Sequence, residues 1–157
     1  MKAATVRELK QELSQRTPKE VLEICLRLSK FKQENKELLT YLLFEAGDEA
    51  SYVRSVKQEI DEQFAQINTR SYYLIKKSVR KVLRAVRKYI RYSSSKETEV
   101  ELLIYFCIKL RDLEPSIFRY TMLRNLYERL VDSIEKKLLK LHEDLQYDYG
   151  VQLEDLR

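Results

Sequence analysis

Residues 71–92 read SYYLIKKSVRKVLRAVRKYIRY, and this stretch decides the fold class. Apolar side chains recur in it every three or four positions, namely Ile75, Val79, Val82, Val86 and Ile90. Because an α-helix has about 3.6 residues per turn, this spacing places all five on one face. The stretch therefore predicts an amphipathic helix that packs against other helices through its apolar face.

The segments on either side continue the helical pattern. Before this stretch, the same apolar spacing predicts a helix over residues 51–67. After it, Ser94 and Glu97 match a capping box, in which a hydroxyl and a carboxylate three residues later satisfy free N–H groups at the start of a helix. The helix that they begin is expected to end near Leu113. Its segment 102–108, LLIYFCI, is apolar nearly all round, so we expect it to be the most buried element.

The two ends of the chain are also predicted to be helical. Thr5 with Glu8 and Thr17 with Glu20 form two more capping boxes, which predict helices over residues 6–15 and 18–32. A third helix is expected from Asn35 to Gly47, with the glycine ending it in the left-handed conformation. A long final helix is predicted over residues 116–146.

These predictions give an all-α protein of six or seven antiparallel amphipathic helices joined by short loops. Only two glycines and two prolines occur, which disfavours a sheet with many tight turns. A chain of 157 residues is long enough for one domain with a real core, so residues 1–157 are predicted to form a single helical domain.

Two segments of the chain resemble each other. Residues 37–44 read ELLTYLLF and residues 101–108 read ELLIYFCI, with four identities in eight positions at an offset of 64. One interpretation is an internal duplication, with three-helix units at 17–68 and 69–146 stacked as a short αα-superhelix, like a helical-repeat protein. The other is chance, because apolar helices draw on few residue types.

Composition and charge placement indicate a cytoplasmic protein without a membrane span. The N-terminus carries charges where a secretory signal needs a continuous apolar run, and no apolar run approaches the length of about 20 residues that crosses a bilayer. Cys25 and Cys107 each lie in an apolar stretch, so we expect both to be buried thiols in a reducing compartment.

The residues needed for catalysis or cofactor binding are scarce. His142 is the single histidine, and its expected place near a helix C-terminus suits a favourable interaction with the helix dipole. Two distant glycines cannot form a phosphate-binding loop, and the cysteines lack the close spacing of zinc ligands. We therefore expect no enzyme activity, no catalytic residue, no metal and no cofactor.

Positive charge is concentrated in residues 70–91, which contain nine Lys and Arg and no Asp or Glu. Since the whole chain carries +5 and this stretch +9, the remainder carries −4. The cations fall within an arc of about 140° opposite the apolar stripe. Those nearest the middle of the arc form the predicted binding site, which we call the basic face: Lys77, Arg80, Lys81, Arg84, Lys88 and Arg91.

Three interpretations of the basic face remain open. The favoured one is a docking surface for a protein partner on a helical-repeat-like domain. The alternative is binding of nucleic acid or another polyanion, with Tyr73, Tyr89 and Tyr92 near the edges of the ridge. The third is a solvated face whose charges are offset by carboxylates of neighbouring helices, such as Glu59, Asp61, Glu62, Glu135 or Glu143. The identity of a partner and the oligomeric state do not follow from the sequence.

Overall fold

The computed structural model describes residues 1–157 and is entirely helical, which confirms the predicted all-α class. It has eight α-helices, one more than the upper predicted number. The chain divides into two compact units, Met1–Phe44 and Glu45–Arg157. No helix combines the length and the apolar character needed to cross a membrane.

The first unit contains α1 (Val6–Ser14), α2 (Pro18–Phe31) and α3 (Gln33–Thr40), and the chain continues into a π-helical turn, Tyr41–Glu45. Both predicted capping boxes are present, because Thr5 and Thr17 accept from the backbone N–H groups of Glu8 and Glu20. Helix α3 packs along α2.

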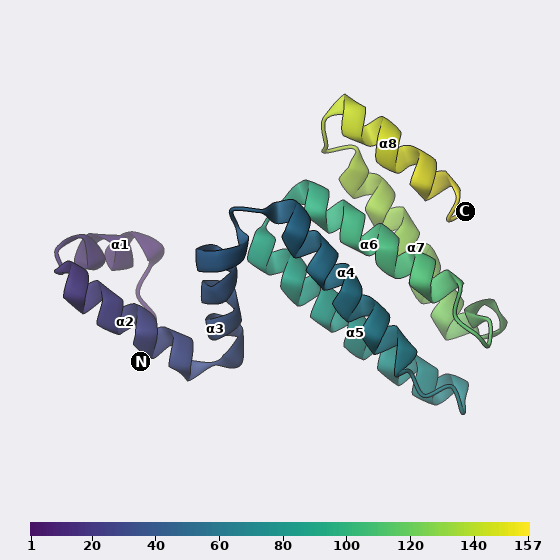
Figure 1. The fold of residues 1–157 in the computed structure, drawn as a ribbon, viewed down its shortest axis with the longest axis horizontal. Helices are drawn as coiled ribbons and strands as arrows, with labels where there is room; N and C mark the ends of the chain where they lie inside the picture. Colours follow the sequence, from purple (N-terminus) through teal and green to yellow (C-terminus); the bar gives the residue numbers. More distant parts are fainter. The chain divides into compact units, whose positions relative to one another are not determined.

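The second unit consists of five long helices in an up-and-down arrangement (Figure 1). They are α4 (Glu49–Ala65), α5 (Tyr72–Ser93), α6 (Lys96–Arg111), α7 (Thr121–Leu138) and α8 (Glu143–Glu154), with a 3-10 turn, Ile117–Arg119, before α7. Helix α6 is central, because it contacts α4, α5, α7 and α8.

The core of the second unit lies where the sequence predicts it. The buried side chains of α5 include the whole apolar stripe from Ile75 to Ile90, together with Leu83. In α6, the buried side chains include Leu102, Leu103, Ile104, Phe106 and Cys107. The prediction that α6 is the most enclosed helix is therefore confirmed.

The predicted final helix is wrong as one continuous element. It breaks after Leu138, and His142 becomes the N-cap of α8, where its Nδ1 accepts from the N–H of Asp144. The amide of Gln146 donates to the Leu141 carbonyl at 2.8 Å, which satisfies a backbone group that the break exposes. His142 thus lies at a helix start, not near a helix C-terminus as predicted.

Three other local predictions are wrong. Asn35 does not cap α3; its side-chain amide donates to the Leu28 carbonyl at 2.8 Å, and Lys32 is the N-cap. Gly47 is not left-handed; the residue with a positive φ is Ser94, which ends α5. Ser95, not Ser94, therefore begins α6, and its hydroxyl accepts from the N–H of Thr98.

The two similar octapeptides differ in local structure. Residues 101–108 lie within the central helix α6, whereas residues 37–44 pass from α3 into the π-helical turn. Leu102 and Leu103 are buried, but Leu38, Leu42 and Leu43 are exposed. The boundary between the compact units follows Phe44 and does not coincide with the predicted repeat boundary at residues 68 and 69.

Removal of the Leu103 side chain tests the central position of α6. Leu103→Ala is expected to lower the free energy of unfolding by about 2 to 5 kcal/mol, because the surrounding helices cannot fully close the cavity. Leu139→Ala, at a side chain that is 70% exposed, is the control and should change it by less than about 0.5 kcal/mol. Equal effects in chemical denaturation would contradict the burial of Leu103.

The Tyr127 hydroxyl provides a pH test of the contact between α7 and the C-terminus. It donates to the Leu156 carbonyl at 2.7 Å, and burial raises the pKa of Tyr127 to about 12. The pKa of tyrosine in the unfolded chain is about 10. The stability that the protonated Tyr127 hydroxyl contributes is therefore fully present below pH 10 and is lost as the pH rises toward 12.

Tyr127→Phe should therefore be about 1 kcal/mol less stable at pH 7 and should lose less stability between pH 10 and pH 12 than the wild type. Denaturant titrations at several pH values measure both effects. Tyr73→Phe, at an exposed tyrosine, is the control. Identical alkaline profiles for wild type and Tyr127→Phe would contradict the assignment.

Candidate functional site

The basic face is held outward by the packing of α5. Helix α5 contacts both α4 and α6. The Tyr52 hydroxyl on α4 donates to the Tyr89 carbonyl at 2.8 Å. At the other end, the rings of Tyr72 and Tyr120 stack with centroids 5.2 Å apart, and the Tyr72 hydroxyl donates to the Ser116 carbonyl. These contacts fix the rotation of α5 about its axis.

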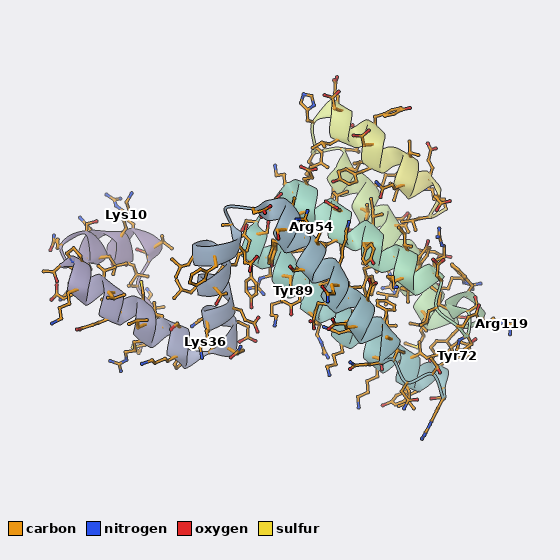
Figure 2. All side chains as sticks on the ribbon, in the orientation of Figure 1. Lys10, Lys36, Arg54, Tyr72, Tyr89 and Arg119 are labelled. Carbon is orange, nitrogen blue, oxygen red and sulfur yellow. The ribbon has the colours of Figure 1, made fainter.

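The structure brings the six predicted cations together on one surface. Five of them, Lys77, Arg80, Lys81, Arg84 and Arg91, are exposed, and Lys88 is half-buried. Long side chains with nitrogen tips extend outward along α5 in Figure 2. The six cations span residues 77–91 of α5, so the row is roughly 20 Å long.

The five exposed cations of the basic face form no ion pair. Lys88 differs, because it has interactions of its own, including its ammonium 5.2 Å from the centre of the Tyr89 ring. The exposed cations therefore repel one another without a compensating carboxylate in contact.

Four of the five carboxylates proposed as neutralising partners interact elsewhere. Asp61 pairs with Lys109 at 3.0 Å and accepts from the Tyr105 hydroxyl at 2.8 Å. Burial acts to raise the pKa of Asp61, but these two hydrogen bonds outweigh it and leave the pKa below its ordinary value. Glu59 accepts a hydrogen bond from Gln63, Glu62 accepts one from Gln58, and Glu135 forms an ion pair with Arg157.

Negative charge is concentrated on the opposite edge of the second unit. Helix α8 contains four carboxylates and no Lys or Arg: Glu143, Asp144, Asp148 and Glu154. It contacts α6 and α7, whereas α5 contacts α4 and α6. Figure 1 shows α8 and α5 at opposite edges of the unit, and Glu143, the fifth proposed carboxylate, is the first residue of α8.

A polar groove runs beside the basic face between α4 and α5. Its volume is about 390 Å³, and its lining includes Gln63 and Gln66 from α4 or its end, and Ser78 and Lys81 from α5. Glu59 also lines it, so the groove is mixed in charge. The groove does not follow from the sequence, because apolar periodicity does not report the space between neighbouring helices.

The tyrosines expected near the ridge do not form a stacking platform. Tyr92 is buried and Tyr89 is half-buried, so only Tyr73 presents an exposed ring. The Lys76 ammonium lies 5.5 Å from the centre of the Tyr73 ring. The chemistry of the basic face is therefore that of cations arranged in a row, with one aromatic ring at its N-terminal end.

A second surface, made of exposed apolar side chains, lies in the first unit. Between Val6 and Phe44, twelve large apolar side chains are exposed, and Cys25 is exposed rather than buried as predicted. The sequence shows which face of a helix is apolar but not whether another element covers it. The unusually wide apolar arc of α2 is the sequence feature from which this surface could have been predicted.

Removal of one unpaired cation should stabilise the second unit. Arg84 lies three or four positions from Lys81, Arg80, Arg87 and Lys88, and like charges at this spacing cost about 0.2 to 0.5 kcal/mol per pair. Arg84→Ala is expected to raise the free energy of unfolding by about 0.3 to 1 kcal/mol at low ionic strength and by less at high salt.

Lys57→Ala is the control, because the Lys57 ammonium pairs with Glu101 at 2.6 Å and its removal should destabilise by about 0.5 to 1 kcal/mol. Denaturant titrations at two salt concentrations provide the measurement. Destabilisation by Arg84→Ala comparable to that of Lys57→Ala would show that Arg84 has a stabilising partner.

Comparison with protein-family models, with curated proteins and with solved structures found no match to this chain.

Proposed function

We propose that this is a non-enzymatic interaction protein that binds an acidic macromolecule through the basic face of α5. The observation that carries the proposal is the row of five exposed cations without an ion-pairing carboxylate. A row of unpaired like charges on a rigid helix costs stability in the free protein. An anionic partner removes that repulsion when it binds.

The first candidate partner is the phosphate backbone of a nucleic acid. The row is roughly 20 Å long and can follow several phosphates, with release of their counterions. None of the exposed residues of α5 between Lys77 and Arg91 is apolar. Stable protein interfaces usually centre on a buried apolar or aromatic anchor, so this composition favours an extended polyanion.

The second candidate is an acidic protein segment, and the groove beside the basic face favours it. The groove offers side-chain amides and a hydroxyl next to Lys81, which suits hydrogen bonds to an extended peptide as well as charge pairing. A polyanion backbone does not need such a groove, so the two candidates differ in the residues that they require.

Charge reversal at the basic face tests the nucleic-acid candidate. The variant carries Arg80→Glu, Arg84→Glu and Arg91→Glu, all at exposed cations without ion pairs. Fluorescence anisotropy measures binding to mixed-sequence single- and double-stranded RNA and DNA at two ionic strengths. We expect wild-type affinity to fall steeply with salt and to ignore sequence, and the slope of log affinity against log salt to decrease by about 2 to 3 in the variant.

The control reverses three exposed cations elsewhere in the second unit: Arg124→Glu, Lys136→Glu and Lys140→Glu. It has the same net charge as the test variant, so a loss confined to the basic-face variant assigns binding to that surface. Equal loss in both variants would mean that net charge alone governs binding. Absence of binding to every nucleic acid at low salt would rule out the first candidate, and binding of an acidic peptide would then support the second.

A further inference from the structure

Two adjacent tyrosines at the start of α5 have different surroundings. Tyr72 is half-buried, its ring stacks on that of Tyr120, and its hydroxyl donates to the Ser116 carbonyl. Tyr73 is 63% exposed, and its hydroxyl forms no hydrogen bond. Tyr72 therefore holds α5 in place, whereas the Tyr73 ring is available to a ligand.

The Tyr73 ring has one neighbour on the protein surface, the ammonium group of Lys76. This ammonium lies over the ring, 5.5 Å from its centre, and 3.7 Å from the Met122 sulfur on α7. A cation is attracted to the face of an aromatic ring, so Lys76 restrains the ring from one side. No other aromatic ring or cation contacts Tyr73. The opposite face of the ring is consequently open.

Tyr73 lies in line with the cations of the basic face. Arg80, Arg84 and Arg91 follow it at 7, 11 and 18 positions along α5. At 3.6 residues per turn, these separations are within about 20° of two, three and five full turns. The ring therefore points in nearly the same direction from the helix axis as the three guanidinium groups. It extends the row by roughly 6 Å beyond Lys77, toward the start of α5.

We propose that the partner of the basic face is a single-stranded nucleic acid, with one unpaired base stacked on the open face of Tyr73. The neighbouring phosphates of the strand then lie along Arg80, Arg84 and Arg91. This inference rests on the proposed function and specifies which form of nucleic acid the basic face binds. Because every base has a flat aromatic face, the stacked base can be of any type.

The combination of an open ring and a row of cations distinguishes a single strand from the other polyanions. In a duplex the bases are paired and stacked on one another, so a duplex can engage the cations but offers no base face to Tyr73. An acidic peptide presents carboxylates, which the negative face of an aromatic ring repels. A single strand carries phosphates and unpaired bases together, and it can therefore use both parts of the surface.

Removal of the ring gives the first test. Fluorescence anisotropy compares three DNA probes at low salt: an unstructured single strand, the duplex of the same sequence, and a single strand of abasic sites. Tyr73→Ala should weaken binding of the base-bearing single strand by at least about fivefold. Binding of the duplex and of the abasic strand should change by less than about twofold, because neither stacks on the ring. Tyr73→Phe keeps the ring and should bind like the wild type.

An exposed tyrosine elsewhere provides the matched control. Tyr147 is 76% exposed and lies on the acidic helix α8, so Tyr147→Ala should leave binding of all three probes unchanged. Equal effects of Tyr73→Ala on the base-bearing and abasic strands would overturn the stacking inference. If charge reversal at the basic face still abolished binding, the proposed function would stand without it. A wild type that binds none of the probes at low salt would overturn both.

A single tryptophan reports the stacking contact directly. The chain contains no tryptophan, so Tyr73→Trp introduces the only indole. This variant should keep its affinity for the single strand, and stacking on a base should quench its emission. The duplex and the abasic strand should bind without that quenching. Tyr147→Trp is the control and should bind the single strand with unchanged emission. Binding of the single strand by Tyr73→Trp without quenching would show that no base contacts this position and would overturn the inference.

Discussion

The second unit depends on the need to enclose α6 on every side. Val100, Leu102, Phe106 and Leu110 have no exposed surface, and they point in different directions around the helix. A helix that is apolar nearly all round must be surrounded, and α4, α5, α7 and α8 supply the four contacts. Because burial of apolar surface is the dominant favourable term in folding, the positions of these four helices follow from the central one.

Polar contacts at the margins of α6 fix how each neighbour is placed. Glu101 pairs with Lys57 of α4, Glu99 with Lys137 of α7, and Glu97 accepts from the Tyr149 hydroxyl of α8. These carboxylates belong to α6 and meet three different helices, so they set register at the edges of an apolar interface. None of them reaches the basic face. The apolar stripe of α5 fixes its orientation on α6, and its cations consequently face solvent.

The sequence was sufficient to predict a helix and its buried face wherever apolar spacing is regular over several turns, as from Ile75 to Ile90. It was insufficient to place a helix boundary where the residues are compatible with two local backbone conformations. Ser94 and Ser95 can both cap a helix, and the choice depends on which of them ends α5 in the left-handed conformation. Leu141 continues an apolar stripe, yet the chain breaks there, because α8 must fold back to bury Tyr149 and Leu153. The exposure of Cys25 depends on what covers α2, which a single chain's periodicity does not contain.

The placement of acidic α8 and basic α5 at opposite edges gives the second unit a permanent electric dipole moment. The field of such a charge separation acts over about 8 Å at physiological ionic strength, farther than any hydrogen bond. Near a negatively charged surface, the unit therefore experiences a torque that turns α5 forward and α8 away before contact. The first collision is thereby biased toward one orientation, and this bias weakens as salt shortens the range of the field.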